Sequence, residues 1–322
     1  MNNNESLKGL TERELLGLIP GRNDKYAHVI RGIGDDCAVV GFNLKNDTYI
    51  LLTQDSIISG RHFVYHSDDP YFVGWKALAR SLSDIAAMGG DPQSALVAYG
   101  IPPDTPVAWL KRVFEGLYDC GKKYSCPIIG GDMASTAGEM FFSTTCMGTV
   151  TKQAIAFRTG TSNGDMLCVT GTLGGSIAGK HLRFEPRIDE AKWLIANSHV
   201  SSMIDLSDGI AKDLSHIAEA GNIGFRIDYE SVPLSQILKS QFGYDTDTAV
   251  YHALYDGEDY ELLFTVSDTE ANVRALCESF SVRFGIPCTV IGRCDSGIET
   301  MELWKNGRRD KNIEPGGFEH FV

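Results

Sequence analysis

Aspartate recurs at the polar end of one apolar segment after another along this 322-residue chain. Each of these aspartates, taken singly, fits a helix cap or a turn, which are common places for the residue. Gathered at one site, five or six carboxylates would raise one another's pKa and oppose folding unless cations were bound. The segments are GIGDD (Asp35, Asp36), LLTQD (Asp55), LSD (Asp84), IIGGD (Asp132) and MIDLSD (Asp205, Asp208).

Strand-like apolar runs alternate with helix-like segments, which predicts a mixed α/β (α+β) architecture. Strands are expected at residues 49–53, 94–101, 127–129, 141–150, 166–170, 202–205, 224–228, 260–266 and 288–292. Helices are expected at 71–88 and 106–123, and after Pro186, Asp208 and Ser267. The length predicts two domains. The polar turn at residues 158–165 is the best boundary, which gives domains of 1–157 and 158–322.

Charge and composition limit the kinds of ligand that the acidic segments can bind. With 29 basic and 42 acidic residues, the net charge of -13 argues against nucleic acid or an anionic membrane as the main partner. The eight cysteines form no C-x-x-C pair, so free buried thiols are expected. Hard oxygen ligands without a Cys or His cluster suit magnesium bridging carboxylates to substrate phosphates. The acidic segments therefore favour nucleotide chemistry.

No apolar run approaches the roughly 18 residues of a membrane span, and the opening MNNNESLKGL lacks the pattern of a signal peptide. We therefore expect a cytoplasmic protein.

Two motifs resemble phosphate-binding loops without completing them. GGSIAGKH, residues 174–181, is a Walker A loop except that His181 replaces the Ser or Thr that holds magnesium. A glycine-rich turn or helix start is the alternative. Gly32 and Gly34 begin a dinucleotide fingerprint that Cys37 does not complete.

Asp84 has an alternative of its own. It follows Lys76 and Arg80 at helical spacings of four, so a surface ion pair with Arg80 competes with a metal-ligand role.

The ordered series GIGDD, LLTQDSIISGRHF, WKALARSLSDIAAMGGDP, IIGGD, IDLSDG and DGEDYELLFTV spans nearly the whole chain. In this series the chain resembles the thiamine-monophosphate kinases. They belong to the ATP-dependent superfamily that includes aminoimidazole ribonucleotide synthetase, selenophosphate synthetase and a hydrogenase maturation factor. The resemblance implies a homodimer formed by the N-terminal domain, with a C-terminal α/β domain completing the active site. It also implies transfer of the ATP γ-phosphoryl group to thiamine monophosphate, giving thiamine diphosphate.

The resemblance also implies roles for particular residues. Magnesium ions would be held by Asp36, Thr53, Asp55, Asp84, Asp132, Asp205 and Asp208. ATP would contact Gly131, Asp132, Arg158 and Ser207, and the thiamine moiety would lie near His62, Glu258 and Phe318. No dedicated catalytic base is expected, because a phosphate monoester is already an anionic nucleophile at neutral pH.

The chain departs from the family pattern at Gln54, at Met133 and in the short segment between Gly174 and His181. The last departure falls in the C-terminal domain, so it concerns the specificity for the phosphate acceptor more than the use of ATP and magnesium. Other readings are a sister enzyme acting on a different phosphate ester, an inactive nucleotide-binding regulator, or an acidic structural protein whose aspartates are all caps. The supporting residues have structural alternatives too: Arg158 as an ion-pair partner, Glu258 as a turn residue, His62 as a partly exposed histidine, and Phe318 as a packing residue.

Overall fold

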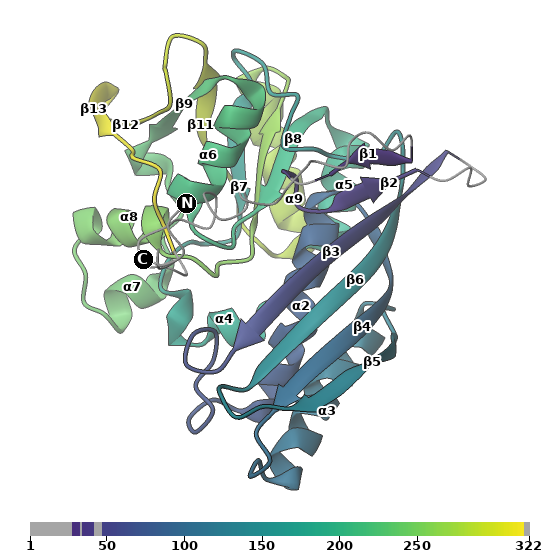
Figure 1. The fold of residues 1–322 in the computed structure, drawn as a ribbon. Helices are drawn as coiled ribbons and strands as arrows, with labels where there is room; N and C mark the ends of the chain where they lie inside the picture. Colours follow the sequence, from purple (N-terminus) through teal and green to yellow (C-terminus); the bar gives the residue numbers. More distant parts are fainter. Residues whose placement is uncertain (1–27, 33, 42–46, 319–322) are drawn as a thin grey trace, which may run out of the picture.

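The computed structural model describes residues 28–32, 34–41 and 47–318. It contains two β-sheets with helices packed against them, so the predicted α and β architecture is confirmed (Figure 1). The first sheet has the order β1-β2-β3-β6-β4-β5, in which only β4 and β5 run parallel. Its strands are β1 (Val29–Arg31), β2 (Ala38–Val40), β3 (Thr48–Ile58), β4 (Asp91–Ile101), β5 (Ile128–Ser135) and β6 (Phe141–Thr151).

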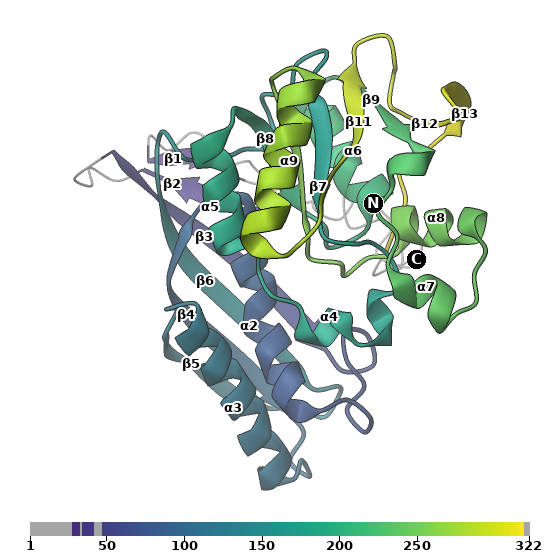
Figure 2. The ribbon, with the colours of Figure 1, turned by 180° about the vertical axis from the view of Figure 1, so that it is seen from behind.

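Two helices, α2 (Pro70–Ala87) and α3 (Val107–Lys123), lie against one face of this sheet (Figure 2). Asp69 caps α2 by accepting from the Tyr71 amide, and Pro70 occupies the first turn. The two helices touch backbone to backbone. A Cβ at Gly74 would lie 1.9 Å from the Val113 carbonyl, and one at Gly116 would lie 1.7 Å from the Tyr71 carbonyl. Only glycine permits this approach.

The second sheet has the order β13-β12-β9-β11-β7-β10-β8, in which only β12 and β9 pair in parallel. Its strands are β7 (Met166–Thr170), β8 (Val200–Asp205), β9 (Gly224–Asp228), β10 (Leu262–Val266), β11 (Cys288–Asp295), β12 (Met301–Lys305) and β13 (Arg308–Asn312). Helices α4 (Lys180–Arg183), α5 (Ile188–Asn197), α6 (Ile210–Gly221), α7 (Gln236–Ser240), α8 (Thr246–Tyr255) and α9 (Glu270–Phe284) surround it, with 3-10 turns η1 (Ser176–Ala178) and η2 (Tyr229–Ser231).

The expectation that an aspartate follows each apolar strand in a short polar turn is wrong at two positions. Asp55 lies inside β3, because the strand continues to Ile58 with alternate residues buried against α2. Asp132 lies inside β5. Asp84 lies inside α2, as the helix expected at 71–88 predicts. The strands at 29–31, 38–40, 301–305 and 308–312 were not predicted, because each has at most five residues and little periodicity.

The cysteines behave as expected: all eight are free thiols and seven are buried. Among the described residues, no helix combines the length and apolarity needed to cross a membrane. The division of the chain between residues 157 and 158 stays a prediction.

Candidate functional site

Three carboxylates meet where the two sheets approach each other. Asp36 follows β1, Asp84 lies in α2, and Asp205 is the last residue of β8. One oxygen from each lies within 4.8 Å of the others. The tertiary structure therefore gathers aspartates that are up to 169 positions apart in the sequence, as the recurring pattern predicted.

The carboxylates of this cluster are held at an electrostatic cost. Burial raises the pKa of Asp84 well above its usual range, and the charges of Asp55, Asp205 and Asp36 raise it further. Burial, followed by the charge of Asp36, raises the pKa of Asp205 to about 8. Neutral hydroxyls provide the hydrogen bonds: Thr53 donates to Asp84, and Ser83 donates to Asp205 at 2.6 Å. Clustered hard oxygens with too little positive charge are the donor set that fits a divalent cation such as magnesium.

Arg158 supplies part of the charge that the stretch GIGDD requires. Its guanidinium donates to both oxygens of Asp36, at 3.2 and 3.0 Å, and its backbone amide donates to Asp35 at 3.2 Å. Asp35 also lies 3.5 Å from Arg31. Burial and the neighbouring Asp36 raise the pKa of Asp35 to about 6. Asp35 therefore takes part in this ion-pair network, beyond shaping the turn.

The proposed surface ion pair between Arg80 and Asp84 is wrong. The guanidinium of Arg80 instead lies 3.5 Å from Asp55 and donates to the Ser56 carbonyl at 3.0 Å. Ser81 also donates to Asp55, at 3.0 Å. Asp84 lies one helical turn further along α2, where it meets the carboxylates of Asp36 and Asp205.

A cavity of about 420 Å³ lies beside the acidic cluster. The structure brings five of the predicted contact residues to its wall: His62, Ser207, Asp208, Glu258 and Phe318. Arg80 also lines it, and so connects the cavity with Asp55 and the acidic cluster. Asp208 lines the cavity, pairs with Lys212 at 2.9 Å and is not one of the three clustered carboxylates.

A buried lysine that the sequence did not single out lies behind the cavity wall. Lys76, fully buried in α2, donates to Glu258 at 2.6 Å and to the His62 carbonyl at 2.8 Å. Burial lowers the pKa of Lys76 to about 8. His62 Nδ1 accepts from the Ile58 amide at 3.1 Å. Lys76 thereby connects two wall residues that are 196 positions apart.

Aromatic side chains form the far wall of the cavity, and sequence analysis missed them. Phe242 stacks on Tyr244 with centroids 5.5 Å apart, and Tyr244 stacks on His252 at 4.3 Å. Asp256, which also lines the cavity, accepts from His252 at 3.0 Å. Phe242 and Tyr244 lie in the segment between α7 and α8, and His252 lies in α8, so the three rings have no regular period and no sequence signal identified them.

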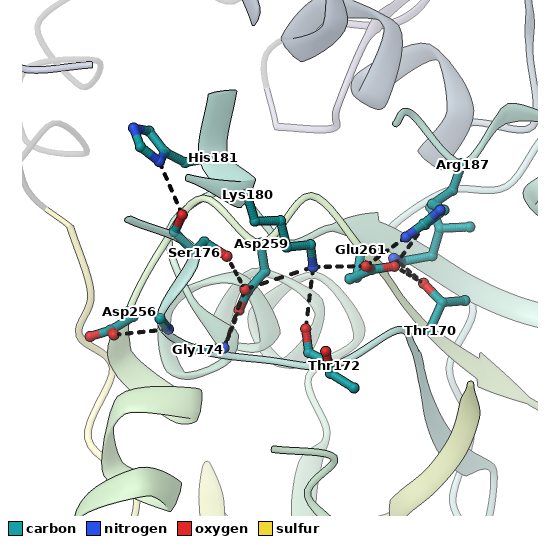
Figure 3. A network of polar contacts seen from close by, with 12 residues as sticks. Thr170, Thr172, Gly174, Ser176, Lys180, His181, Arg187, Asp256, Asp259 and Glu261 are labelled. Atoms are coloured by element: carbon teal, nitrogen blue, oxygen red, sulfur yellow. Dashed lines mark hydrogen bonds and ion pairs between the residues drawn. The ribbon is translucent and has the colours of Figure 1, made fainter. Parts of the chain in front are cut away.

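The Walker-like loop does not form a phosphate site. The loop already has a carboxylate partner: Asp259 accepts from the Gly174 amide at 2.9 Å and from the Ser176 hydroxyl (Figure 3). Lys180, which takes the position of the Walker lysine, is bound to Glu261 at 2.8 Å and to the Thr172 carbonyl at 3.2 Å. The segment is a glycine-rich turn leading to a short helix, which was the alternative interpretation.

Gly131 and Asp132 lie apart from the other predicted ligands. In the sheet register, Asp132 of β5 pairs with Ala98 of β4 and Ala98 pairs with Ser143 of β6. Ser143 in turn pairs with Ser56 of β3. Three strand spacings of about 4.8 Å place it roughly 14 Å from the strand that carries Asp55. Asp132 instead lines a second cavity with Tyr99 and other residues near the sheet edge. A single chain therefore does not assemble the complete set of predicted ligands.

Two paired domains with an acidic cluster between them define a class of protein. The chain belongs to the AIR synthase related family: the N-terminal domain model matches residues 34–150 and the C-terminal domain model matches residues 152–300.

Within that class, the curated relatives are thiamine-monophosphate kinases. The enzyme of Rhodopirellula baltica is 35% identical, over 96% of this chain and 97% of the relative. That of Escherichia coli K12 is also 35% identical, over 90% and 92%. This chain is therefore a member of the thiamine-monophosphate kinase family, whose members are phosphotransferases.

Solved structures agree with this membership. The structure of AaThiL complexed with AMPPCP and TMP is 29% identical with a TM-score of 0.78, and the match covers 97% of both chains. The thiamine monophosphate kinase of Stenotrophomonas maltophilia K279a is 30% identical with a TM-score of 0.70, over 89% of this chain and 93% of the other.

Proposed function

We propose that this chain catalyses the ATP-dependent phosphorylation of thiamine monophosphate to thiamine diphosphate. The observation that carries the proposal is the position of the acidic cluster beside an aromatic cavity, with Arg80 lining the cavity and paired with Asp55. A cavity lined by stacked rings and the carboxylates Asp256 and Glu258 suits an acceptor with a cationic aromatic ring, which thiamine monophosphate has. The related AaThiL binds AMPPCP and TMP.

The reaction needs no general base. An oxygen of the acceptor phosphate attacks the γ-phosphorus, the new P–O bond forms, and the bond from the γ-phosphorus to the β,γ-bridging oxygen breaks. Its electron pair stays on ADP. Because the attacking phosphate is already anionic, the protein's task is to align two polyanions and to neutralise their charge.

We assign the metal-binding role to the predicted set of Asp36, Thr53, Asp55, Asp84, Asp132, Asp205 and Asp208. Magnesium ions bound there would neutralise phosphate oxygens and hold them in line for transfer. Gly131, Asp132, Arg158 and Ser207 would contact ATP, and His62, Glu258 and Phe318 would contact the thiamine moiety. Free cysteines without a disulfide support the cytoplasmic location that we include in the proposal.

A homodimer is part of the proposal because one face of the first sheet is uncovered. Among the residues that the structure describes, no helix overlies the outer face of β3, β6 and β4 in Figure 1. Leu52 pairs in register with Met147, and Ile58 pairs with Phe141, and all four are at least 36% exposed. An exposed apolar sheet face of this kind favours association with a second copy. A second copy would also offer its Asp132 to the incomplete site.

The function is tested by incubating purified protein with ATP, magnesium and a panel of phosphate acceptors. The panel contains thiamine monophosphate, thiamine, and the phosphate esters of the isolated thiazole and pyrimidine halves. We expect thiamine diphosphate and ADP in equal amounts from thiamine monophosphate. Turnover of a different ester alone would replace the acceptor and keep the reaction class. ATP binding without turnover of any acceptor would support the nucleotide-binding regulator instead.

A further inference from the structure

Two buried polar side-chain atoms outside the ion pairs around GIGDD have no hydrogen-bond partner among the residues that the structure describes. They are Nε of Arg80 and the hydroxyl of Tyr260. The third such atom, Nε of Arg31, lies 3.5 Å from an oxygen of Asp35 and belongs to the ion pairs around GIGDD. An unpaired buried donor is unfavourable, and its retention calls for an explanation in function or structure. Of the two residues, Arg80 is the one that lines the cavity.

Arg80 occupies the boundary between the two halves of the site. Its guanidinium lines the acceptor cavity and lies 3.5 Å from Asp55, and its residue is one helical turn from Asp84. The Ser56 carbonyl accepts one N–H at 3.0 Å, which leaves other N–H groups available for a phosphate oxygen. Its side chain is 15% exposed, so it is accessible from the cavity.

We propose that Arg80 is a catalytic residue that contacts the phosphoryl group during its transfer. The inference rests on the proposed function, because it places Arg80 between the phosphates of ATP and of the acceptor. A planar guanidinium can donate two N–H groups to phosphate oxygens on which negative charge accumulates in the transition state. Nothing is oxidised and no proton moves: Arg80 stays protonated throughout.

The test removes the guanidinium and then supplies it again. In Arg80→Ala we expect kcat to fall on the order of 100-fold, as for the loss of a preorganised donor. The KM for ATP should change little, because the acidic cluster remains. Added methylguanidinium should restore a measurable part of kcat. The matched control is Arg112→Ala on α3, an exposed arginine, where neither the substitution nor the additive should change kcat.

These outcomes separate the inference from the function on which it rests. If the wild-type protein produces no thiamine diphosphate, the proposed function fails first. If the wild type is active and Arg80→Ala retains its kcat, the inference alone is overturned. An inactive Arg80→Ala that has lost binding of AMPPCP, or that methylguanidinium does not restore, also contradicts a role in transfer.

Discussion

Single residues of the acidic cluster are placed for function at the expense of stability. Asp84 and Asp205 are buried next to each other and to Asp36, so like charges oppose folding in the metal-free protein. Hydroxyls and the nearby Arg158 offset part of that repulsion. A cation that binds the folded chain would stabilise it further by mass action.

Asp84→Asn should therefore separate stability from metal binding. Without magnesium we expect the free energy of unfolding to rise, because burial and the neighbouring carboxylates oppose the charge of Asp84 and an amide carries none. The stabilisation that magnesium gives the wild type should be largely lost, and turnover should fall severely. Asp36→Asn should likewise abolish turnover. Thermal unfolding with and without magnesium measures both effects.

The control is Asp104→Asn, which changes the net charge by the same amount as Asp84→Asn. Asp104 is exposed in the connection between β4 and α3. It should respond to magnesium as the wild type does. An unchanged magnesium response in Asp84→Asn would show that this carboxylate is no ligand.

At the scale of elements, one buried ion-pair network fixes the segment from Gly174 to Arg187 against the start of β10. Glu261 accepts from Lys180 at 2.8 Å, from Arg187 at 2.7 Å and from Thr170 at 2.9 Å (Figure 3). Despite burial, the two cations lower the pKa of Glu261 to about 2. The same segment carries Phe184, whose ring positions Tyr260. The short connection before His181 is therefore an ordered part of the site.

Glu261 should make stability depend on acid pH. Its folded pKa of about 2 lies below the usual 4.5, so its contribution is fully present above pH 4.5 and is lost as pH falls towards 2. The difference corresponds to about 3 kcal/mol. Glu261→Gln should cost about 3 to 5 kcal/mol at pH 7, because two buried cations lose their partner. It should also reduce the loss of stability below pH 4.5, as measured by urea unfolding.

Glu185→Gln is the matched control. Glu185 accepts from Lys123 at 2.6 Å, but both side chains are exposed, so the expected loss is below about 1 kcal/mol. Equal losses in the two variants would contradict a special role for the buried network.

At the scale of the whole molecule, the position of Asp132 is the feature that one chain leaves unexplained. It lies three strands from β3 in the same sheet, on the strand at the sheet edge. If a second copy presents its Asp132 to the cluster, each active site contains residues from both chains.

Mixing two inactive variants tests this arrangement. Asp36→Asn and Asp132→Asn should each abolish turnover alone. Equal amounts of the two variants are unfolded and refolded together, so that half of the dimers contain one chain of each variant. In each of these mixed dimers, one of the two sites combines the intact Asp36 of one chain with the intact Asp132 of the other. We expect about a quarter of wild-type activity. No recovery in a mixture shown to contain mixed dimers would place both residues in one chain's site.

The sequence by itself predicted the recurring aspartates as ligands and determined the broad architecture. Oxygen ligands without a Cys or His cluster indicated a hard cation, and the long periodic helices at 70–87 and 107–123 agree with the expected ranges within a residue. These features depend on residue type and local periodicity, which are visible in one dimension.

Only the tertiary structure decided how those residues are arranged. It placed Asp84 with Asp36 and Asp205 and paired Arg80 with Asp55, although helical spacing alone favoured the pair Arg80 and Asp84. It placed the Asp259 carboxylate where it accepts from the Gly174 amide of the Walker-like loop. It also stacked Phe242, Tyr244 and His252 in one wall of the cavity. Each of these arrangements depends on contacts between segments distant in sequence, because burial and sheet register set side-chain partners more strongly than local spacing does.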